Sequence, residues 1–462
     1  MSSSSSSSGT EGGEEGIGPS SPAPRRTDEP SPSRRRSAEA VWPEHVVEAV
    51  AIRVASDVSL SAGRLAVAPA IVSIFQVCST WRAISSSELL WRELSRLVFN
   101  RHHPLRPSWR EEFVRLHRLG LNFRFNRYSH HSVYPPSITA CRRLAVSDHH
   151  LAAGFLDGSV VLFELPSCQH LVTYPFDHTR ERLGNFSQSI SGIVLLFDRL
   201  IYASQDGDVH VAEALYPPSS WPCRRVHVGN LMEDGVLVDF SGDDRRWVGL
   251  YAGVPGRSFR VWNAEADQQQ VLYVGGSLTD PDSVAGLHLL TDLPGPMLGR
   301  ARVGQPGTMM VACTGSGLQA IAIGGDHDDD NAGEVLSEVE FPRRAVVECM
   351  DACEGSVLLM DSRGRARVLQ AKTLEEVCRF NTMRRRRGRL SAGCMNWGYV
   401  VICLPDGVIK VWDAATGKKL YSFRERICEY SSTIVASYRH VAVICPRTGK
   451  LNIWDFGGDL LD

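Results

Sequence analysis

The chain has 462 residues, of which 43% are hydrophobic and 22% are charged, and its net charge is −2. A chain of this length can bury a large core and is expected to form two or three units. It has no apolar run of the roughly 18 residues that a membrane-spanning helix needs, and its start lacks the basic and apolar regions of a secretory signal. The sequence therefore predicts a protein that stays inside the cell and does not use a membrane.

The first forty residues differ in composition from the rest of the chain. Residues 1–40 are mostly Ser, Gly, Pro, Glu and Arg, and Ser2 to Ser8 form an unbroken serine run. With almost nothing apolar to bury, this composition predicts a disordered tail. The short run from Arg34 to Arg36 fits a nuclear import signal and fits an ordinary solvated tail as well.

Residues 41–98 have helical spacing and are dense in Trp and Leu, which predicts a small α-helical domain. Pro43 suits a helix first turn, where its missing N–H costs nothing, and Ser87 is a good N-cap. A glycine- and serine-containing stretch from Ser56 to Pro69 fits either an insertion or an extended helix. Apolar residues recur every three or four positions in three segments, namely Val46, Val47, Val50 and Val54, then Ile71, Ile74, Phe75 and Cys78, and then Leu89, Leu90, Trp91 and Leu94.

This helical segment resembles the F-box. The resemblance rests on Trp42-Pro43-Glu44, Val77-Cys78-Ser-Thr-Trp81-Arg82 and Ser87-Glu-Leu89-Leu90-Trp91, with Trp42 where the F-box usually has Leu. It implies binding to a Skp-type adaptor through an apolar set made of Pro43, Val47, Val77, Cys78, Trp81, Leu89, Leu90 and Trp91. The alternative is a helical bundle that only packs against the following domain and closes it. Residues 99–120 are predicted to be a helical linker, with a helix that begins after Pro107.

Residues 121–462 contain a repeat made of a small turn and a short apolar strand. The turn glycines stand 42 to 61 residues apart, close to the period of a four-stranded propeller blade, at Gly158, Gly207, Gly256, Gly317, Gly364, Gly407 and Gly449. Side chains alternate along each copy, and an Asp-Gly turn is a strong hairpin signal. The clearest copies end in Trp412-Asp413 and Trp454-Asp455.

These copies resemble WD repeats, which implies a seven-bladed WD-type β-propeller and a mainly β protein. A propeller must close its ring, because an unpaired strand edge invites aggregation. Too few residues follow Asp455 for a further strand, whereas Asn122 to Tyr128 precede the first blade. We therefore expect residues 122–128 to form the outer strand of the last blade.

The sequence contains no set of catalytic residues. It lacks a phosphate-binding Gly-Lys-Ser/Thr loop, a nucleophile elbow, a His-Glu-x-x-His motif and a kinase signature. Its twelve cysteines lack zinc-site spacing and are expected to be buried free thiols. The sequence thus predicts a protein without catalytic residues, metal or cofactor.

Basic residues cluster in the loops that follow the outer strands of the expected blades. In WD-type blades these loops share a face with the Asp-Gly turns, so this face is expected to carry Arg180, Arg182, Arg343, Arg344, Arg384, Arg385, Arg386, Arg387, Arg424 and Arg426. Guanidinium groups bind carboxylates and phosphates in a bidentate manner, which suits an acidic or phosphorylated target. Unrelated solvated loops, or an import signal at Arg384 to Arg387, explain the pattern equally well. Nucleic acid is disfavoured because the propeller segment is net acidic.

An F-box followed by a WD-type propeller resembles the substrate receptors of cullin-based ubiquitin ligases. The whole chain also resembles a family of plant regulators of flower and organ development, on Val-Trp-Pro-Glu at 41, Phe-Gln-Val-Cys at 75, Ser-Asp-His-His at 147 and Trp-Val-Gly-Leu-Tyr at 247. This second resemblance implies a nuclear protein that promotes the removal of repressors of the PEAPOD or KIX type. The alternative is a nuclear transcriptional scaffold without a ligase partner.

Overall fold

The computed structural model divides the chain into two compact units, Met1–Phe113 and Val114–Asp462. The predicted tail lies outside the described residues, and the unit boundary falls inside the segment predicted to be a linker. The structure describes residues 42–137, 139–175, 188–213, 222–254, 256–264, 271–275, 299–304, 308–314, 317–323, 333–341, 347–382, 391–427 and 433–458.

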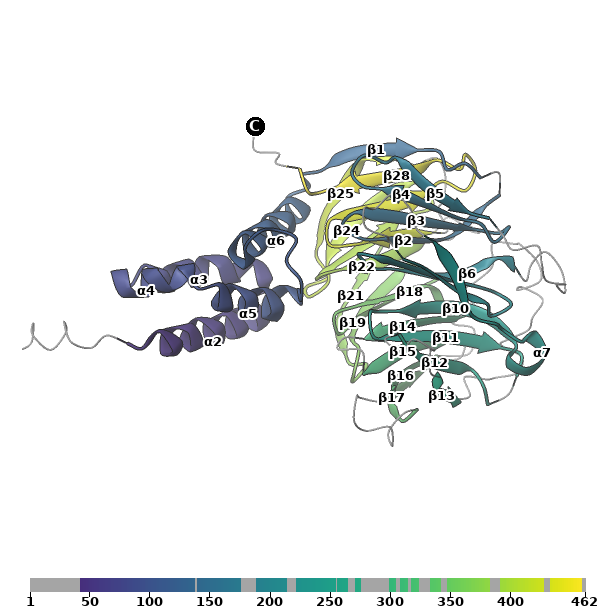
Figure 1. The fold of residues 1–462 in the computed structure, drawn as a ribbon, viewed down its shortest axis with the longest axis horizontal. Coiled ribbons are helices and arrows are strands. Elements are labelled where there is room, and N and C mark those ends of the chain that lie inside the picture. The colour runs from purple at the N-terminus through teal and green to yellow at the C-terminus, as the bar shows by residue number, and fades with distance from the viewer. Residues whose placement is uncertain are drawn as a thin grey trace, which may run out of the picture. The chain divides into compact units, whose positions relative to one another are not determined.

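The first unit is helical (Figure 1). Its elements are α2 (Glu44–Ala62), η1 (Arg64–Ala66), α3 (Val67–Phe75), α4 (Ser79–Ala83), η2 (Ile84–Ser86), α5 (Glu88–Phe99) and the start of α6 (Trp109–Arg124). Pro43 directly precedes α2, and its carbonyl accepts the backbone N–H of Val46 at 2.9 Å. The helix continues to Ala62, so the stretch after Ser56 begins as an extension of α2 and not as a loop.

The buried face of α2 differs from the predicted one. Val47, Ala51 and Ala55 are buried, one turn apart, whereas Val50 is exposed and Val54 is half-buried. Two alanines at four-residue spacing let α2 lie close to α3 and α5, and the larger valines of the adjacent stripe then remain toward solvent. Of the expected stripe of Val46, Val47, Val50 and Val54, only Val47 is fully buried, because the prediction weighed side-chain size and overlooked alanine.

The second unit contains seven four-stranded antiparallel sheets among its described residues (Figure 1). The first four sheets in chain order are β2 (Cys141–Val146), β3 (His150–Phe155), β4 (Val160–Glu164) and β5 (His170–Tyr174); β6 (Ile190–Leu195), β7 (Arg199–Ser204), β8 (Val209–Glu213) and β9 (Cys223–His227); β10 (Val236–Gly242), β11 (Arg246–Ala252), β12 (Phe259–Asn263) and β13 (Val271–Gly275); and β14 (Gly299–Gly304), β15 (Met309–Thr314), β16 (Gly317–Ala322) and β17 (Val335–Glu340). A short helix, α7 (Leu231–Asp234), precedes β10.

The remaining three sheets complete the ring. They are β18 (Val347–Cys353), β19 (Ser356–Asp361), β20 (Arg365–Gln370) and β21 (Glu376–Asn381); β22 (Ala392–Asn396), β23 (Tyr399–Cys403), β24 (Val408–Asp413) and β25 (Lys419–Arg426); and β26 (Ile434–Ala436), β27 (His440–Ile444) and β28 (Leu451–Asp455) with β1 (Ser129–Val133). The first strand of each blade lies beside the first strand of the next, and β26 lies beside β2. The predicted seven-bladed propeller is therefore confirmed.

The predicted turn glycines join the second and third strands of the blades. Six of the seven have a positive φ, the left-handed region that a side chain disfavours, and Gly317 is the exception because it begins β16. Gly407 also lacks room for a side chain, since an added Cβ would lie 1.9 Å from the carbonyl oxygen of Ile427. The aromatic residues that end the clearest repeats are buried, namely Phe163, Trp262, Trp412 and Trp454.

The last blade is closed by β1 and not by residues 122–128. β1 pairs with β28 in antiparallel register from Ser129 with Asp455 to Val133 with Leu451. Asn122 to Arg124 form the last turn of α6, because Phe123 is drawn into an aromatic cluster with Tyr399 and Phe456 at ring distances of 4.8 and 4.5 Å. A strand that precedes the first blade does close the ring, as predicted, but it begins at Ser129 and therefore directly follows the predicted residues 122–128.

Two side chains next to β1 hold the closure in place. The Asn122 amide donates to the Phe456 carbonyl at 2.9 Å. The Tyr128 hydroxyl donates to Glu425 Oε2 at 2.9 Å and accepts the backbone N–H of Arg424 at 3.0 Å. Glu425 also accepts Trp454 Nε1–H at 2.9 Å, so one carboxylate links β25 to the closed blade.

The expectation of buried free thiols holds for only some of the described cysteines, since Cys78 and Cys223 are exposed and Cys141, Cys168, Cys353 and Cys378 are half-buried. Cys313, Cys349, Cys394 and Cys403 are buried free thiols, whereas Cys445 is disulfide-bonded, so the expectation of free thiols was wrong there. No described helix is both long enough and apolar enough to cross a bilayer.

Candidate functional site

The residues predicted to bind an adaptor divide into an exposed group and a buried group. Val77 and Leu89 are each 63% exposed, and Pro43 and Cys78 are also exposed. Trp81 is half-buried. Val47, Leu90 and Trp91 are core residues at 0%, 1% and 7% exposure. Only the exposed residues and Trp81 can contact a partner. The buried residues can contribute only by stabilising the fold of the helical unit.

Trp91 shows how the core positions the exposed residues. Its ring packs against Phe75 and Phe113 at centroid distances of 6.0 and 5.2 Å, and its Nε1–H donates to the Ser85 carbonyl at 2.7 Å. Ser87 caps α5, because its hydroxyl accepts the Leu90 N–H at 3.3 Å. The cap fixes where α5 begins and therefore which way Leu89 points.

We define the exposed residues Val77, Cys78 and Leu89 as the apolar surface of the helical unit. Val77 and Cys78 follow α3, and Leu89 lies in the first turn of α5. Large apolar side chains that are exposed on a small unit are candidates for an interaction site. The spacing of these residues along the chain follows the F-box-like motifs.

Most of the predicted arginine face lies outside the described residues. This applies to Arg180, Arg182, Arg343, Arg344 and Arg384 to Arg387. Arg424 and Arg426 are described, are exposed and lie at the end of β25. Arg426 pairs in register with Val408, the residue that follows the Gly407 turn, which places Arg426 at the turn face.

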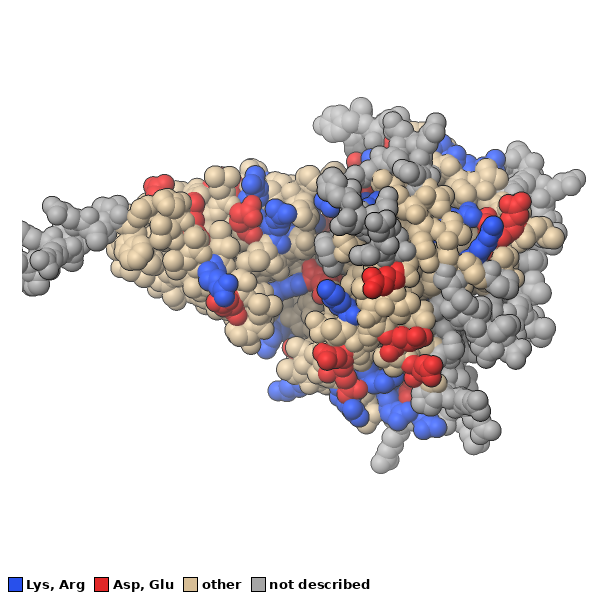
Figure 2. All heavy atoms as spheres, turned by 90° about the horizontal axis from the view of Figure 1, so that it is seen from below, with Lys and Arg blue, Asp and Glu red and all other residues tan. Residues whose placement is uncertain are grey.

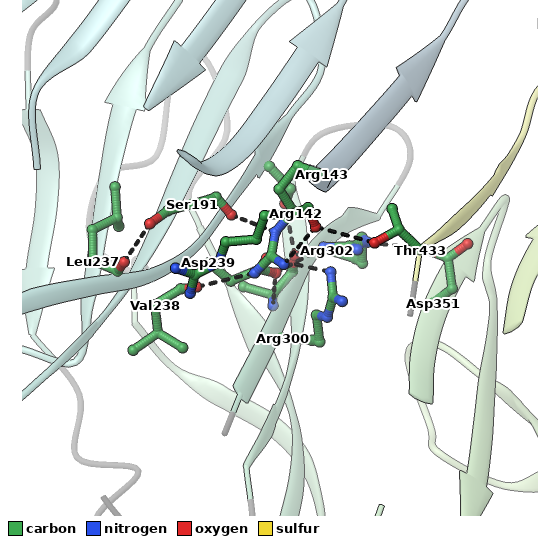
Figure 3. Close-up of polar contacts among 12 residues, drawn as sticks. Arg142, Arg143, Ser191, Leu237, Val238, Asp239, Arg300, Arg302, Asp351 and Thr433 are labelled. Carbon is green, nitrogen blue, oxygen red and sulfur yellow. Dashed lines mark hydrogen bonds and ion pairs between the residues drawn. The ribbon is translucent and has the colours of Figure 1, made fainter. Parts of the chain in front are cut away.

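A second charged group, missed by the sequence prediction, lies in the central channel. The seven inner strands line a cavity of about 290 Å³. Figure 3 shows Arg143 from β2, Asp239 from β10, Arg300 and Arg302 from β14, and Asp351 from β18 around this cavity. We call these five residues the channel cluster. Arg300 and Arg302 alternate with small residues along β14, so both side chains point the same way, and this alternation is the signal that could have identified them.

Asp239 is the centre of the channel cluster. Its side chain is 1% exposed, its Oδ2 accepts Arg302 Nη1–H at 2.8 Å and the Ala301 N–H at 3.0 Å, and its Oδ1 lies 3.4 Å from Arg143 Nη2 and 3.6 Å from Arg300 Nη1. Burial alone would raise the pKa of Asp239, but Arg302, Arg300 and Arg143 together hold it below its usual value. The carboxylate therefore stays ionised.

The arginines of the channel cluster are in unequal environments. Burial opposes the charge of Arg302, yet Asp239 and Asp351 raise its pKa above the usual value. Burial, followed by the nearby Arg300, holds the pKa of Arg143 well below its usual value. Arg302 is thus well paired, whereas Arg143 carries its charge at a cost.

The arginines of the channel cluster present guanidinium groups to the cavity. Across the described parts of the chain, His, Cys, Asp and Glu do not gather into a group that could hold a metal ion. Basic and acidic side chains lie interspersed on the molecular face in Figure 2, without a continuous basic surface among the described residues there. The arrangement suits recognition of a single anionic group more than a nucleic-acid backbone.

The fold and these sites define a seven-bladed β-propeller protein with an N-terminal helical unit. No family model matches the chain. Over 440 residues it is 41% identical to the transcriptional regulator STERILE APETALA of Arabidopsis thaliana, an alignment that covers 93% of this chain and 95% of that protein. The chain therefore belongs to the STERILE APETALA family.

Proposed function

We propose that this protein is the substrate-receptor subunit of a Skp-cullin-F-box ubiquitin ligase. The helical unit binds a Skp-type adaptor and, through it, a cullin, and the propeller holds a target protein. The receptor performs no bond chemistry, because its role is to raise the effective concentration of target lysines near a conjugating enzyme. We further propose that it acts in the nucleus and controls flower and organ development by removing repressors of the PEAPOD or KIX type.

One observation carries the adaptor half of this proposal. Val77 and Leu89 stand at F-box-like motif positions and are each 63% exposed, while Trp91, two residues after Leu89, is in the core. Two large apolar side chains that are exposed at motif positions offer contact area to a partner protein. The apolar surface thus supports binding to a partner protein.

The target half of the proposal rests on the propeller. A ring of blades presents a rigid face of turns and loops, and Arg426 lies at that face beside the Gly407 turn. An acidic or phosphorylated target segment would pair with arginines there. The arginines outside the described residues remain part of this proposal.

The second candidate function is a nuclear transcriptional scaffold that acts through the propeller without a ligase partner. The similarity to the Arabidopsis transcriptional regulator favours it. The two functions make different demands on the helical unit, because only the receptor needs an adaptor surface.

Adaptor binding by surface variants tests the receptor function. We would replace Val77 and Leu89 by Ala in the full chain and measure the affinity for a purified Skp-type adaptor by calorimetry. Loss of two exposed apolar anchors should weaken binding at least tenfold, at about 1 to 2 kcal/mol for each side chain. Leu60→Ala, at an equally apolar and 86% exposed position of α2, is the matched control and should bind like the unaltered chain.

A further inference from the structure

Arg300 has a different role from the other arginines of the channel cluster. Its side chain lines the cavity and is 24% exposed, and its closest charged partner, Asp239, lies at 3.6 Å. This separation is longer than a charge-assisted hydrogen bond of about 2.8 Å. Within the described residues, no hydrogen bond from its five N–H donors is formed. A guanidinium with free donors at a cavity wall is suited to bind a ligand.

The acidic groups around the cavity are already engaged. Asp239 is held by Arg302 and the Ala301 N–H. Asp351 accepts Arg302 Nε–H at 2.9 Å and the Met395 N–H at 2.9 Å. Glu348 accepts the Ser391 N–H at 3.1 Å. Because these acidic groups are bound by other residues, Arg300 is the cation of the channel cluster with the fewest contacts to acidic groups.

Arg143 stands beside Arg300 in a fixed position. Its guanidinium donates to the carbonyl oxygens of Ser191, Arg142 and Val238 at 2.7, 3.2 and 3.3 Å. Figure 3 shows it near Arg300 and Asp239. Two guanidinium groups that lie near one carboxylate oxygen repel each other, and the pKa of Arg143 is lowered first by burial and then by Arg300. A further anion would relieve this repulsion.

Arg300 lies near the turn face of the propeller. The Leu156 N–H, before the Gly158 turn, donates to the Ala140 carbonyl just before β2, and the Gln205 N–H donates to the Ser189 carbonyl just before β6. Inner strands therefore start at the turn face. Arg300 is the second residue of β14, so a group that enters from this face meets Arg300 early.

We propose that the channel cluster binds one anionic group, a carboxylate or a phosphate, with Arg300 as the recognising side chain and Arg143 as its neighbour in fixed position. Arg302 is structural, since it joins Asp239 to Asp351. An acidic or phosphorylated side chain of a target, or a free anion, supplies this chemistry. The inference deepens the proposed function and rests on the propeller being the target-binding part.

The test measures binding of three probes to the full chain at low ionic strength by equilibrium dialysis. The probes are inorganic phosphate, N-acetyl-aspartate amide and N-acetyl-phosphoserine amide. We expect Arg300→Met to weaken binding of the preferred probe at least tenfold, and Arg300→Lys to weaken it several-fold because lysine lacks the fork. Arg199→Met, on β7 and outside the channel lining, is the matched control and should leave binding unchanged.

The outcomes separate the source of the anion. Tighter binding of a blocked amino acid than of inorganic phosphate assigns a target side chain, and the reverse order assigns a free anion. Failure of the unaltered chain to bind any probe, or equal binding by Arg300→Met, overturns the site. Adaptor affinity, measured on the same variants, should not change, so a failed anion site is distinguished from a failed receptor function. The thermal midpoint of each variant shows whether it is folded.

Discussion

Arg302 Nη1 lies 2.8 Å from Asp239 Oδ2, and this ion pair joins two neighbouring blades inside the channel. The Nε of the same guanidinium reaches Asp351 on the following blade at 2.9 Å. One side chain therefore connects the inner strands of three successive blades.

Loss of this connection should destabilise the propeller strongly. Arg302→Met would leave Asp239 buried with weaker partners, and breaking a buried pair costs about 3 to 5 kcal/mol. Arg365→Met is the control, because Arg365 has an ion pair of the same 2.8 Å length to Asp361 but its side chain is 61% exposed. The control should cost less than about 1 kcal/mol. Denaturant unfolding measures both, and equal losses would contradict the structural role of Arg302.

The turn glycines allow a test of backbone strain against steric overlap. Gly398 and Gly407 both have a positive φ, but only at Gly407 would an added Cβ meet another group, the Ile427 carbonyl at 1.9 Å. Gly398→Ala should cost about 1 to 2 kcal/mol from backbone strain alone. Gly407→Ala should cost clearly more, as measured by thermal unfolding. A similar loss of stability in both variants would mean that the turn at Gly407 moves away from the Ile427 carbonyl at no further cost in free energy.

Stability should depend on pH through His440. Burial holds the pKa of this fully buried residue at about 4, with Arg439 acting in the same direction and Asp455 opposing. The unfolded chain then binds the proton more readily, so stability is present above pH 6.5 and falls as the pH drops toward 4, by about 3 kcal/mol. His440→Gln should make this dependence shallower and lower stability at neutral pH. Part of the dependence should remain, because burial also lowers the pKa values of His117, His130, His150 and His227. The same change at the exposed His131 should leave the profile as it is in the unaltered chain.

The closure of the ring should depend on the Tyr128 hydroxyl. Tyr128→Phe removes the hydrogen bond to Glu425 and leaves the Arg424 N–H without its acceptor, which should cost about 1 to 3 kcal/mol. Tyr134→Phe, at a position that is 65% exposed, should be neutral. Differential scanning calorimetry compares the two, and an unaffected midpoint for Tyr128→Phe would show that the closing strand holds without this contact.

The sequence predicted those parts of the fold that depend on local chemistry. Turn glycines such as Gly158 and Gly407 mark positions with positive φ, and a fixed period between them reveals blades. The closing strand was misplaced because Asn122 to Tyr128 alternate like a strand, whereas Phe123 is drawn into an aromatic core with Tyr399 and Phe456, which are far away along the chain. Long-range packing overrides such short patterns.

The sites were harder to predict for the same reason. Val77 and Leu89 carry motif spacing, so their importance was visible, but the sequence did not show that Trp91 is core and Leu89 is surface. The channel cluster unites Arg143, Asp239 and Arg300 from three blades, and only closure of the ring brings them together. Local sequence pattern identifies individual helices and strands, whereas the fold brings residues from different blades together into the site.

We propose above that this protein joins a target to a ligase through its helical unit. The most direct measurement is light scattering with size-exclusion chromatography of the full chain mixed with a Skp-type adaptor and a cullin. We expect one complex with one copy of each protein, and we expect this complex to be lost when Val77 and Leu89 are replaced by Ala without a change in the thermal midpoint. Separate elution of the folded, unaltered chain from the adaptor and cullin would rule out the receptor function.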